Sequence, residues 1–249
     1  MSRLDNTFGQ QQVTSQQREQ KIRRVFKLVA SRYDLMNDFM SFGTHRIWKR
    51  VFVQHVDAKS TDIIIDLAGG TGDIARQLKQ KGAYVVVADP SMEMMTEGQK
   101  SHTEKLLNIA ATGEQLPFAS ASIEKLTISF GIRNMTSISD ALAEIFRVLK
   151  PGGQFYCLEF SKVMMPLRPF YNLYNRYIIP RLGAMVARQP EAYQYLIESI
   201  ERFPDQKEMK QLIEQAGFSQ VHYRNLFFGI ACIHMATKPA ESDSKQQNV

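Results

Sequence analysis

Long apolar runs are missing from the chain. No stretch of about 18 consecutive apolar residues occurs, so a membrane-spanning helix is excluded by length. Cysteine is scarce: Cys157 and Cys232 each lie inside an apolar run, and neither belongs to a CxxC pair. Buried reduced thiols are therefore favoured over a disulfide or a metal site. No cluster of His, Cys and carboxylate residues has the spacing of metal ligands, so we expect no metal. The scarce, unpaired cysteines and the lack of a long apolar run favour a cytoplasmic protein.

The two ends of the chain lack the composition of a packed domain. Residues 1–21 are polar and rich in Gln, with no apolar core for a secretory signal, and residues 240–249 are similar. We expect both to be disordered tails. The formal charge of +6 and the pI near 9.3 indicate an anionic partner, either nucleic acid or a membrane surface.

What the chain does contain is an alternation of short apolar runs and helical patterns. This alternation predicts an α/β fold with a mostly parallel sheet, in a single domain over residues 22–239 with a helical cap at 22–58. Ligands of such sheets bind at the carboxyl ends of the strands. The predicted strands are 62–66, 83–89, 106–110, 125–130 and 154–159, with two more inside 221–236.

A glycine-rich loop follows the first of these strands, in the sequence Asp66-Leu-Ala-Gly-Gly-Thr-Gly-Asp73. Gly70-Thr71-Gly72 with Ala75 satisfies a dinucleotide-type spacing, so spacing alone leaves NAD open. The two carboxylates argue against it, because negative charge at the start of the helix repels a pyrophosphate. They favour S-adenosylmethionine, which carries an ammonium and a sulfonium and no phosphate. Asp66 is the candidate partner of the ammonium.

The next strand ends at Asp89, whose carboxylate can accept hydrogen bonds from both ribose hydroxyls. The loop after the third strand contains Thr112 and Gly113, which are candidates for the adenine side. Helix capping alone explains Asp66, and a turn before proline alone explains Asp89. Their occurrence at the ends of consecutive strands favours the cofactor interpretation.

Four stretches carry a resemblance to a known family. They are the glycine loop, Tyr33–Trp48 (YDLMNDFMSFGTHRIW), Ser129–Asn134 (SFGIRN) and Arg147–Ser161 (RVLKPGGQFYCLEFS). The chain resembles the class I methyltransferases and, within them, the ubiquinone/menaquinone biosynthesis C-methyltransferases, over roughly residues 22–238. The resemblance implies a Rossmann-like, mostly parallel seven-stranded sheet with helices on both faces.

The same resemblance implies roles for individual positions. Gly70 and Thr71 match the cofactor loop, Asp89 matches the ribose carboxylate, and Ser129 matches a cofactor contact on the fourth strand. Thr112-Gly113 occupies the adenine-side pair, although family members often place Asp or Asn where Thr112 stands, so a backbone contact is expected there.

The implied reaction is transfer of a methyl group to a ring carbon of a polyprenylated benzoquinol or demethylmenaquinol. The ring carbon becomes nucleophilic when a neighbouring hydroxyl loses its proton, so the site needs a base or a cation beside the phenolate. Arg133 is the candidate cation, with a salt bridge as its alternative role. His45, Tyr33 and Glu159 are the candidate bases.

A basic and aromatic insertion spans residues 162–200. Its first part, 162–190, contains no Asp or Glu and interleaves Arg and Lys with Phe, Tyr and Ile. Such a segment suits an anionic membrane interface, so we expect peripheral contact with membrane lipid at the inner face of the cytoplasmic membrane. A helical insertion packed on its own core is the alternative.

Other functions remain open at this stage. A nucleic-acid methyltransferase is disfavoured, because Ser129–Asn134 lacks the Asn/Asp-Pro-Pro-aromatic motif usual after the fourth strand, so no nucleic acid is expected. The glycine-rich loop also fits three other functions: another small-molecule methyltransferase, an NAD enzyme, or a non-catalytic cofactor-binding scaffold of a quinone-biosynthesis complex. The assembly state, including a homo-oligomer, is also open.

Overall fold

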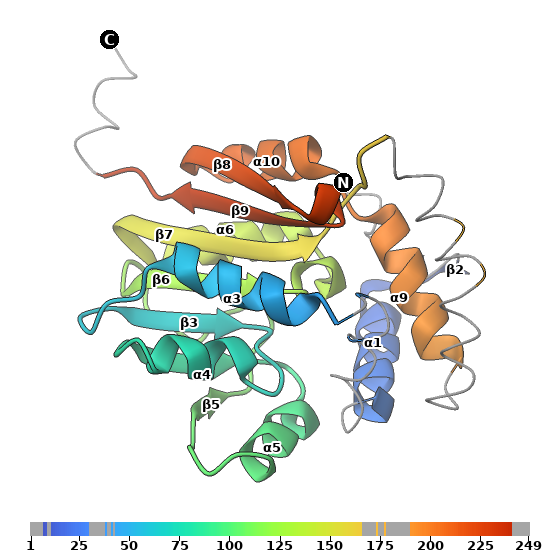
Figure 1. Cartoon of the computed structure of the whole chain (residues 1–249), viewed down its shortest axis with the longest axis horizontal. Coiled ribbons are helices and arrows are strands. Elements are labelled where there is room, and N and C mark those ends of the chain that lie inside the picture. Colours follow the sequence, from blue (N-terminus) through green and yellow to red (C-terminus); the bar gives the residue numbers. More distant parts are fainter. Residues whose placement is uncertain are drawn as a thin grey trace.

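A seven-stranded sheet forms the centre of the molecule. The computed structural model describes residues 7–8, 11–29, 38, 41, 43–165, 173, 177 and 190–240. The sheet order is β5-β4-β3-β6-β7-β9-β8, with β9 antiparallel to both of its neighbours and the other pairs parallel (Figure 1). The strands are β3 (Ile63–Leu67), β4 (Tyr84–Ala88), β5 (Leu107–Ile109), β6 (Ile123–Ser129), β7 (Leu149–Phe160), β8 (Ser219–Leu226) and β9 (Ala231–Thr237).

Helices cover both faces of this sheet, which confirms the predicted fold class. Figure 1 shows α3 and α4 in front of the sheet and α6 and α10 behind it. Neighbouring residues of β3 point to opposite faces: Ile64 packs with α3 and α4, and Ile65 packs with α6 and α10. The helices are α1 (Ser15–Val29), α3 (His45–Val56), α4 (Asp73–Lys79), α5 (Met92–Lys100), α6 (Ile138–Val148), α9 (Pro190–Arg202) and α10 (Gln206–Gln215).

The N-terminal segment differs from the prediction, because α1 begins at Ser15 and not near residue 22. Thr14 and Gln17 explain the early start. The Thr14 hydroxyl accepts from the Gln17 amide at 3.2 Å, and the Gln17 side chain accepts from the Thr14 amide at 3.0 Å. This reciprocal cap satisfies two amides at the helix end. The expected tail at 1–21 is thus wrong for residues 15–21, and β1 (Thr7–Phe8) pairs with β2 (Gln11–Gln12) just before them.

The strand predicted at 154–159 begins earlier than expected, because β7 starts at Leu149 and includes the Pro151-Gly152-Gly153 turn. The pairing with β6 shifts register at this point, and Gly152 adopts a left-handed φ of 78°. Pro and Gly therefore produce a bulge here and not a strand start.

Only part of the expected insertion at 162–200 is described. Its last residues form α9, whose Tyr195 is 3% exposed and stacks on Phe8. Residues 166–172, 174–176 and 178–189, which carry most of the basic and aromatic pattern, lie outside the described residues. Within the described part of the chain, no helix is long and apolar enough to cross a membrane.

Candidate active site

A cavity opens at the carboxyl ends of β3, β4 and β6. It encloses about 860 Å³, its open mouth included. Five of the sequence-predicted residues line it: Asp66, Gly70, Thr71, Asp89 and Ser129. They come from three separate strand ends, as the parallel topology requires.

Asp66 lies at the floor of the cavity with its side chain fully buried. One carboxylate oxygen accepts from the Thr127 hydroxyl at 2.9 Å, and the other accepts from the Ala75 amide at 3.2 Å. Burial raises the pKa of Asp66 to about 7 in spite of these donors. The Ala75 amide belongs to the first turn of α4, so a carboxylate already satisfies a donor that a bound phosphate would need.

Gly69 lets the loop fold down on this carboxylate. A Cβ at Gly69 would lie 2.7 Å from the Asp66 Oδ2 atom, which is closer than atoms can approach. The loop also holds Ala68 at a left-handed φ of 52°, a conformation that costs a non-glycine residue free energy. The glycine therefore serves the packing of the loop onto Asp66 as well as any approach of a ligand.

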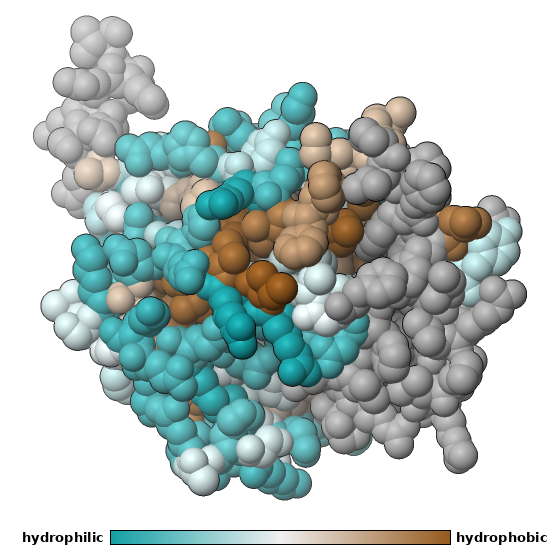
Figure 2. Space-filling model, in the orientation of Figure 1, coloured by the Kyte–Doolittle hydropathy of each residue, from teal (hydrophilic) through white to brown (hydrophobic). Residues whose placement is uncertain are grey.

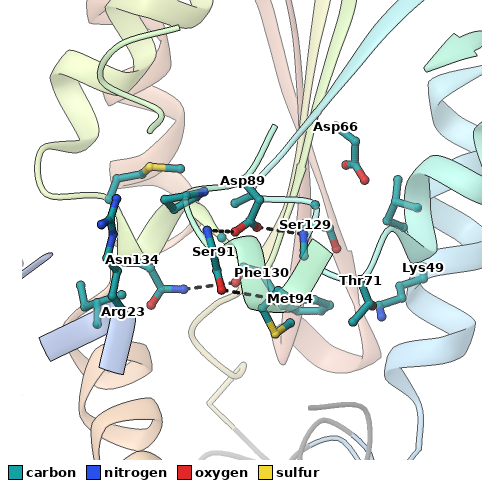
Figure 3. Close-up of a pocket in the computed structure, with 18 residues that line it drawn as sticks. Arg23, Lys49, Asp66, Thr71, Asp89, Ser91, Met94, Ser129, Phe130 and Asn134 are labelled. Atoms are coloured by element: carbon teal, nitrogen blue, oxygen red, sulfur yellow. Dashed lines mark hydrogen bonds between the residues drawn. The ribbon is translucent and has the colours of Figure 1, made fainter. Parts of the chain in front are cut away.

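Asp89 directly follows β4 and holds the glycine loop through the Gly70 amide. Its oxygens accept from the Gly70 amide at 2.9 Å and from the Ser91 amide at 2.7 Å. Figure 3 shows the bond to Ser91. Burial raises the pKa of Asp89 to about 6, against the effect of the two amides. Each carboxylate oxygen has two lone pairs, so both keep acceptor capacity for a ligand. Ser91 caps the start of α5, since its hydroxyl accepts from the Met94 amide.

Asp73 does not present the free negative charge that we expected at the start of α4. Lys49 of α3 lies 2.7 Å from the Asp73 carboxylate. Burial alone would raise the pKa of Asp73, but Lys49 outweighs it and the pKa is lowered. Asp66 and Asp89 therefore remain as the acidic groups in the cavity wall that would disfavour a diphosphate. Lys49 itself lines the cavity, and sequence reasoning missed it because it pairs with a residue 24 positions away.

Ser129 supplies an unsatisfied polar group. Its hydroxyl is buried against the cavity and has no hydrogen-bond partner among the described residues. A buried hydroxyl without a partner is costly unless a ligand or water completes it. Together with Asp66 and Asp89, it fits the amino, hydroxyl and carboxylate groups of S-adenosylmethionine, so the residues present match the predicted cofactor.

Thr112 and Gly113 do not line the cavity. Thr112 forms an isolated bridge with Gln115, and Gly113 packs on Met135 so closely that a Cβ would meet the Met135 sulfur at 2.5 Å. Met135 does line the cavity. The adenine-side pair is therefore separated from the cavity by the Met135 side chain in this structure.

Arg133 is buried in the short helix η2 (Ile132–Asn134) and does not line the cavity. Its Nη1 atom lies 2.5 Å from Glu159 and donates to the Phe130 carbonyl at 2.8 Å. Burial raises the pKa of Glu159 against the attraction of Arg133. The salt bridge that sequence reasoning left as the alternative is present. Arg133 Nε and Nη2 nevertheless have no partner among the described residues.

The candidate bases lie elsewhere. His45 begins α3, is 3% exposed, and its Nε2 atom lies 2.8 Å from the Asp38 carboxylate. It does not line the cavity, nor does Glu159. Tyr33 lies outside the described residues. Among the described residues, no group of three or more His, Cys, Asp or Glu could hold a metal.

The sheet order, the antiparallel β9 and the paired aspartates at the ends of β3 and β4 are those of the class I methyltransferase fold. Solved structures share this fold: a possible histamine N-methyltransferase of Thermotoga maritima superposes with a TM-score of 0.64 at 17% identity, covering 87% of this chain and 99% of that one. The [4+2]-cyclase SpnF gives 0.63 at 13% identity, covering 89% and 96%. Such low identities establish the fold alone.

Sequence comparison is more specific. The profile of the ubiE/COQ5 methyltransferase family matches residues 14–238, and the chain belongs to this family. A ubiquinone/menaquinone biosynthesis C-methyltransferase of Rubrivivax gelatinosus is 55% identical over 95% of this chain and 94% of its own length. The mitochondrial 2-methoxy-6-polyprenyl-1,4-benzoquinol methylase of Drosophila melanogaster is 44% identical over 93% and 84%. These findings confirm the resemblance predicted from the motifs.

Proposed function

We propose that the chain transfers a methyl group from S-adenosylmethionine to a ring carbon of a polyprenylated benzoquinol, a demethylmenaquinol, or both. The observation that carries the proposal is the cavity at the strand ends of a ubiE/COQ5 family member, with Asp66, Asp89 and Ser129 in its wall. The cofactor supplies an electrophilic methyl group on a sulfonium, so the chain itself has to bind, orient and exclude water.

The described residues divide this work. Asp66 would hold the ammonium of the cofactor, since a cation restores the ionised form of a carboxylate whose pKa burial has raised. Asp89 would accept the ribose hydroxyls while its backbone bonds keep the loop in place. The Ser129 hydroxyl, which has no partner among the described residues, would form a hydrogen bond with the bound cofactor.

Arg133 remains our candidate for stabilising the phenolate form of the quinol. Two of its nitrogen atoms, Nε and Nη2, have no partner among the described residues. The neighbouring Phe130 and Asn134 line the cavity, so the guanidinium lies directly behind its wall. Full burial limits the solvent screening of the guanidinium charge, and the Glu159 carboxylate at 2.5 Å offsets part of that charge. His45 and Tyr33 stay as candidate bases, His45 acting through its contact with Asp38.

The substrate tail sets where the enzyme works. A polyprenyl tail resides in lipid, so we propose that the protein makes peripheral contact with the inner face of the cytoplasmic membrane.

A turnover assay tests the proposed function. The purified chain is incubated with S-adenosylmethionine and a short-prenyl quinol of each type under reducing conditions, and the product is examined by mass spectrometry for one added methyl group on the ring. We expect methylation of at least one quinol. Arg133→Lys should retain more activity than Arg133→Ala, while Arg202→Ala, at the end of α9, serves as a control. Binding of S-adenosylhomocysteine without any methylation of either quinol would instead indicate a non-catalytic scaffold.

A further inference from the structure

Large apolar side chains meet solvent at one end of the sheet. Phe227 and Phe228 lie in the short helix η3 (Phe227–Gly229) between β8 and β9, and are 45% and 65% exposed. Met164 and Met165 follow β7 and are 52% and 75% exposed. The Met164 amide donates to the Phe228 carbonyl at 2.9 Å, so the two segments touch. We call these four residues the phenylalanine patch. Figure 2 shows apolar atoms gathered from α3 to this turn.

The backbone under the two phenylalanines is unfavourable for them. Phe227 and Phe228 adopt left-handed φ values of 45° and 58°. Glycine and Asn adopt this conformation readily, whereas bulky side chains do so at a cost in free energy. The Phe228 side chain contributes little to the free energy of folding, because 65% of the residue is exposed. The ring is therefore better explained by contact with something outside the chain.

The segments that form the patch and its neighbours on α3 contain no acidic residues of their own, although Asp38 pairs with Arg46 and Glu201 of α9 lies beside Lys162. Residues 43–56, 161–165 and 217–240 contain no Asp or Glu. They lie together in the fold, since the Trp48 ring of α3 contacts the Phe227 ring at a centroid distance of 5.9 Å. An apolar surface whose own segments contain no Asp or Glu suits an interface with anionic headgroups.

The elements that contact or lead into the patch, α3 and β8, carry exposed arginines. Arg224 of β8 contacts His55 of α3 at 3.0 Å, which places both elements on one face. Arg46 is paired with Asp38 at 2.8 Å. Arg50 is exposed and has no ion pair among the described residues. Arg50 and Arg224, which form no ion pair with an acidic residue among the described residues, are thus available to an anionic surface.

We propose that the phenylalanine patch inserts into the interfacial layer of an anionic lipid bilayer, with the arginines of α3 and β8 at the headgroups. This inference rests on the proposed function, because a polyprenylated substrate has to be reached in lipid. An aromatic route joins the patch to the cavity: Phe227 contacts Trp48, and Trp48 lies 6.3 Å from Phe130 in the cavity wall. Docking at the patch would bring the cavity to the side of the membrane.

Flotation with vesicles tests the docking surface directly. The full chain is mixed with phosphatidylcholine vesicles, with and without phosphatidylglycerol, at low and high salt. Phe228→Asn should lower partitioning about tenfold, the loss expected for one partly inserted ring. Its melting temperature should stay level or rise, because Asn suits a left-handed φ. Arg50→Gln should lower partitioning about fivefold on anionic vesicles at low salt alone.

Leu107→Asn is the matched control. Leu107 is 50% exposed on β5, the strand at the opposite edge of the sheet from β8. This substitution should leave partitioning unchanged. Equal losses for Leu107→Asn and Phe228→Asn would overturn the proposal, as would a wild-type chain that floats with neither type of vesicle.

Further arms separate other occupants and the function itself. If Phe228→Asn left flotation unchanged but converted a dimer to a monomer in sedimentation, the occupant would be a second copy and the lipid proposal would be wrong. Turnover of a short-tail quinol without lipid should be the same for wild type and Phe228→Asn. If flotation depends on Phe228 but the chain methylates no quinol, membrane docking is supported and the proposed function fails. If the chain methylates a quinol but does not float with vesicles, the proposed function is supported and membrane docking fails.

Discussion

Gly98 of α5 offers a sharp test of how the cofactor loop is held. A Cβ at Gly98 would lie 2.1 Å from the Thr71 carbonyl oxygen, where about 3.0 Å is the closest real approach. Gly98→Ala therefore has to move α5 or the loop by about 1 Å. Arg76 also holds this contact, because it donates to the Thr71 carbonyl and to the Gly98 carbonyl, each at 2.6 Å.

The magnitude follows from two opposing effects. Replacing glycine by alanine inside a helix gains about 1 kcal/mol, while overpacking a close contact costs about 1–3 kcal/mol. We expect a free energy of unfolding that is unchanged or lower by up to about 2 kcal/mol. Displacement of Thr71, which lines the cavity, should weaken S-adenosylhomocysteine binding by about tenfold, or about 1.4 kcal/mol.

Isothermal titration with S-adenosylhomocysteine measures this effect, with thermal unfolding recorded in parallel. Thr96→Ala is the control, because Thr96 is exposed on the same helix and its substitution should leave the affinity unchanged. Arg76→Lys should also weaken binding, since a single ammonium cannot bridge both carbonyls in the manner of a guanidinium. Wild-type affinity in Gly98→Ala together with a raised melting temperature would refute the idea that this contact positions the loop.

Three further predictions concern charge and capping. Burial raises the pKa of Asp66 to about 7 and that of Asp89 to about 6, both above the unperturbed value of 3.8, so the folded chain holds more protons than the unfolded chain and its free energy of unfolding without ligand should fall as pH rises from about 4 to about 7. The affinity for S-adenosylhomocysteine should weaken as pH falls below about 7. An affinity that does not change with pH would contradict this prediction. Glu159→Gln should lower the free energy of unfolding by about 3–5 kcal/mol in chemical denaturation, because it leaves the Arg133 charge buried and uncompensated, and a loss below about 1 kcal/mol would show that solvent reaches the pair. Thr14→Ala should cost about 1 kcal/mol through loss of the α1 cap, measured by the same denaturation, and no change would mean that α1 frays at this end.

The strands and the glycine loop could be predicted because their signals are local. Ile63 to Ile65 form a short continuous apolar run of the kind typical of a strand covered on both faces, and glycines follow after three intervening residues. The start of α1 was missed because residues 1–21 have a polar, Gln-rich composition, although the Thr14 and Gln17 pair is itself a readable capping signal.

The electrostatics of the site could be predicted only in part. Asp66 and Asp89 reach the cavity because parallel strands end at one edge, which the strand pattern already implies. The neutralisation of Asp73 by Lys49 depends on how α3 packs against α4, and no spacing in the sequence encodes it. The burial of Arg133 likewise depends on tertiary packing, since its partner Glu159 lies 26 residues further along the chain.

The central claim is that acidic groups at two strand ends select a positively charged cosubstrate. Titration of the wild-type chain with S-adenosylhomocysteine and with NADH, side by side in one buffer, tests it most directly. We predict saturable binding of S-adenosylhomocysteine that Asp89→Asn weakens, and no saturable binding of NADH. NADH binding as tight as that of S-adenosylhomocysteine would contradict the account.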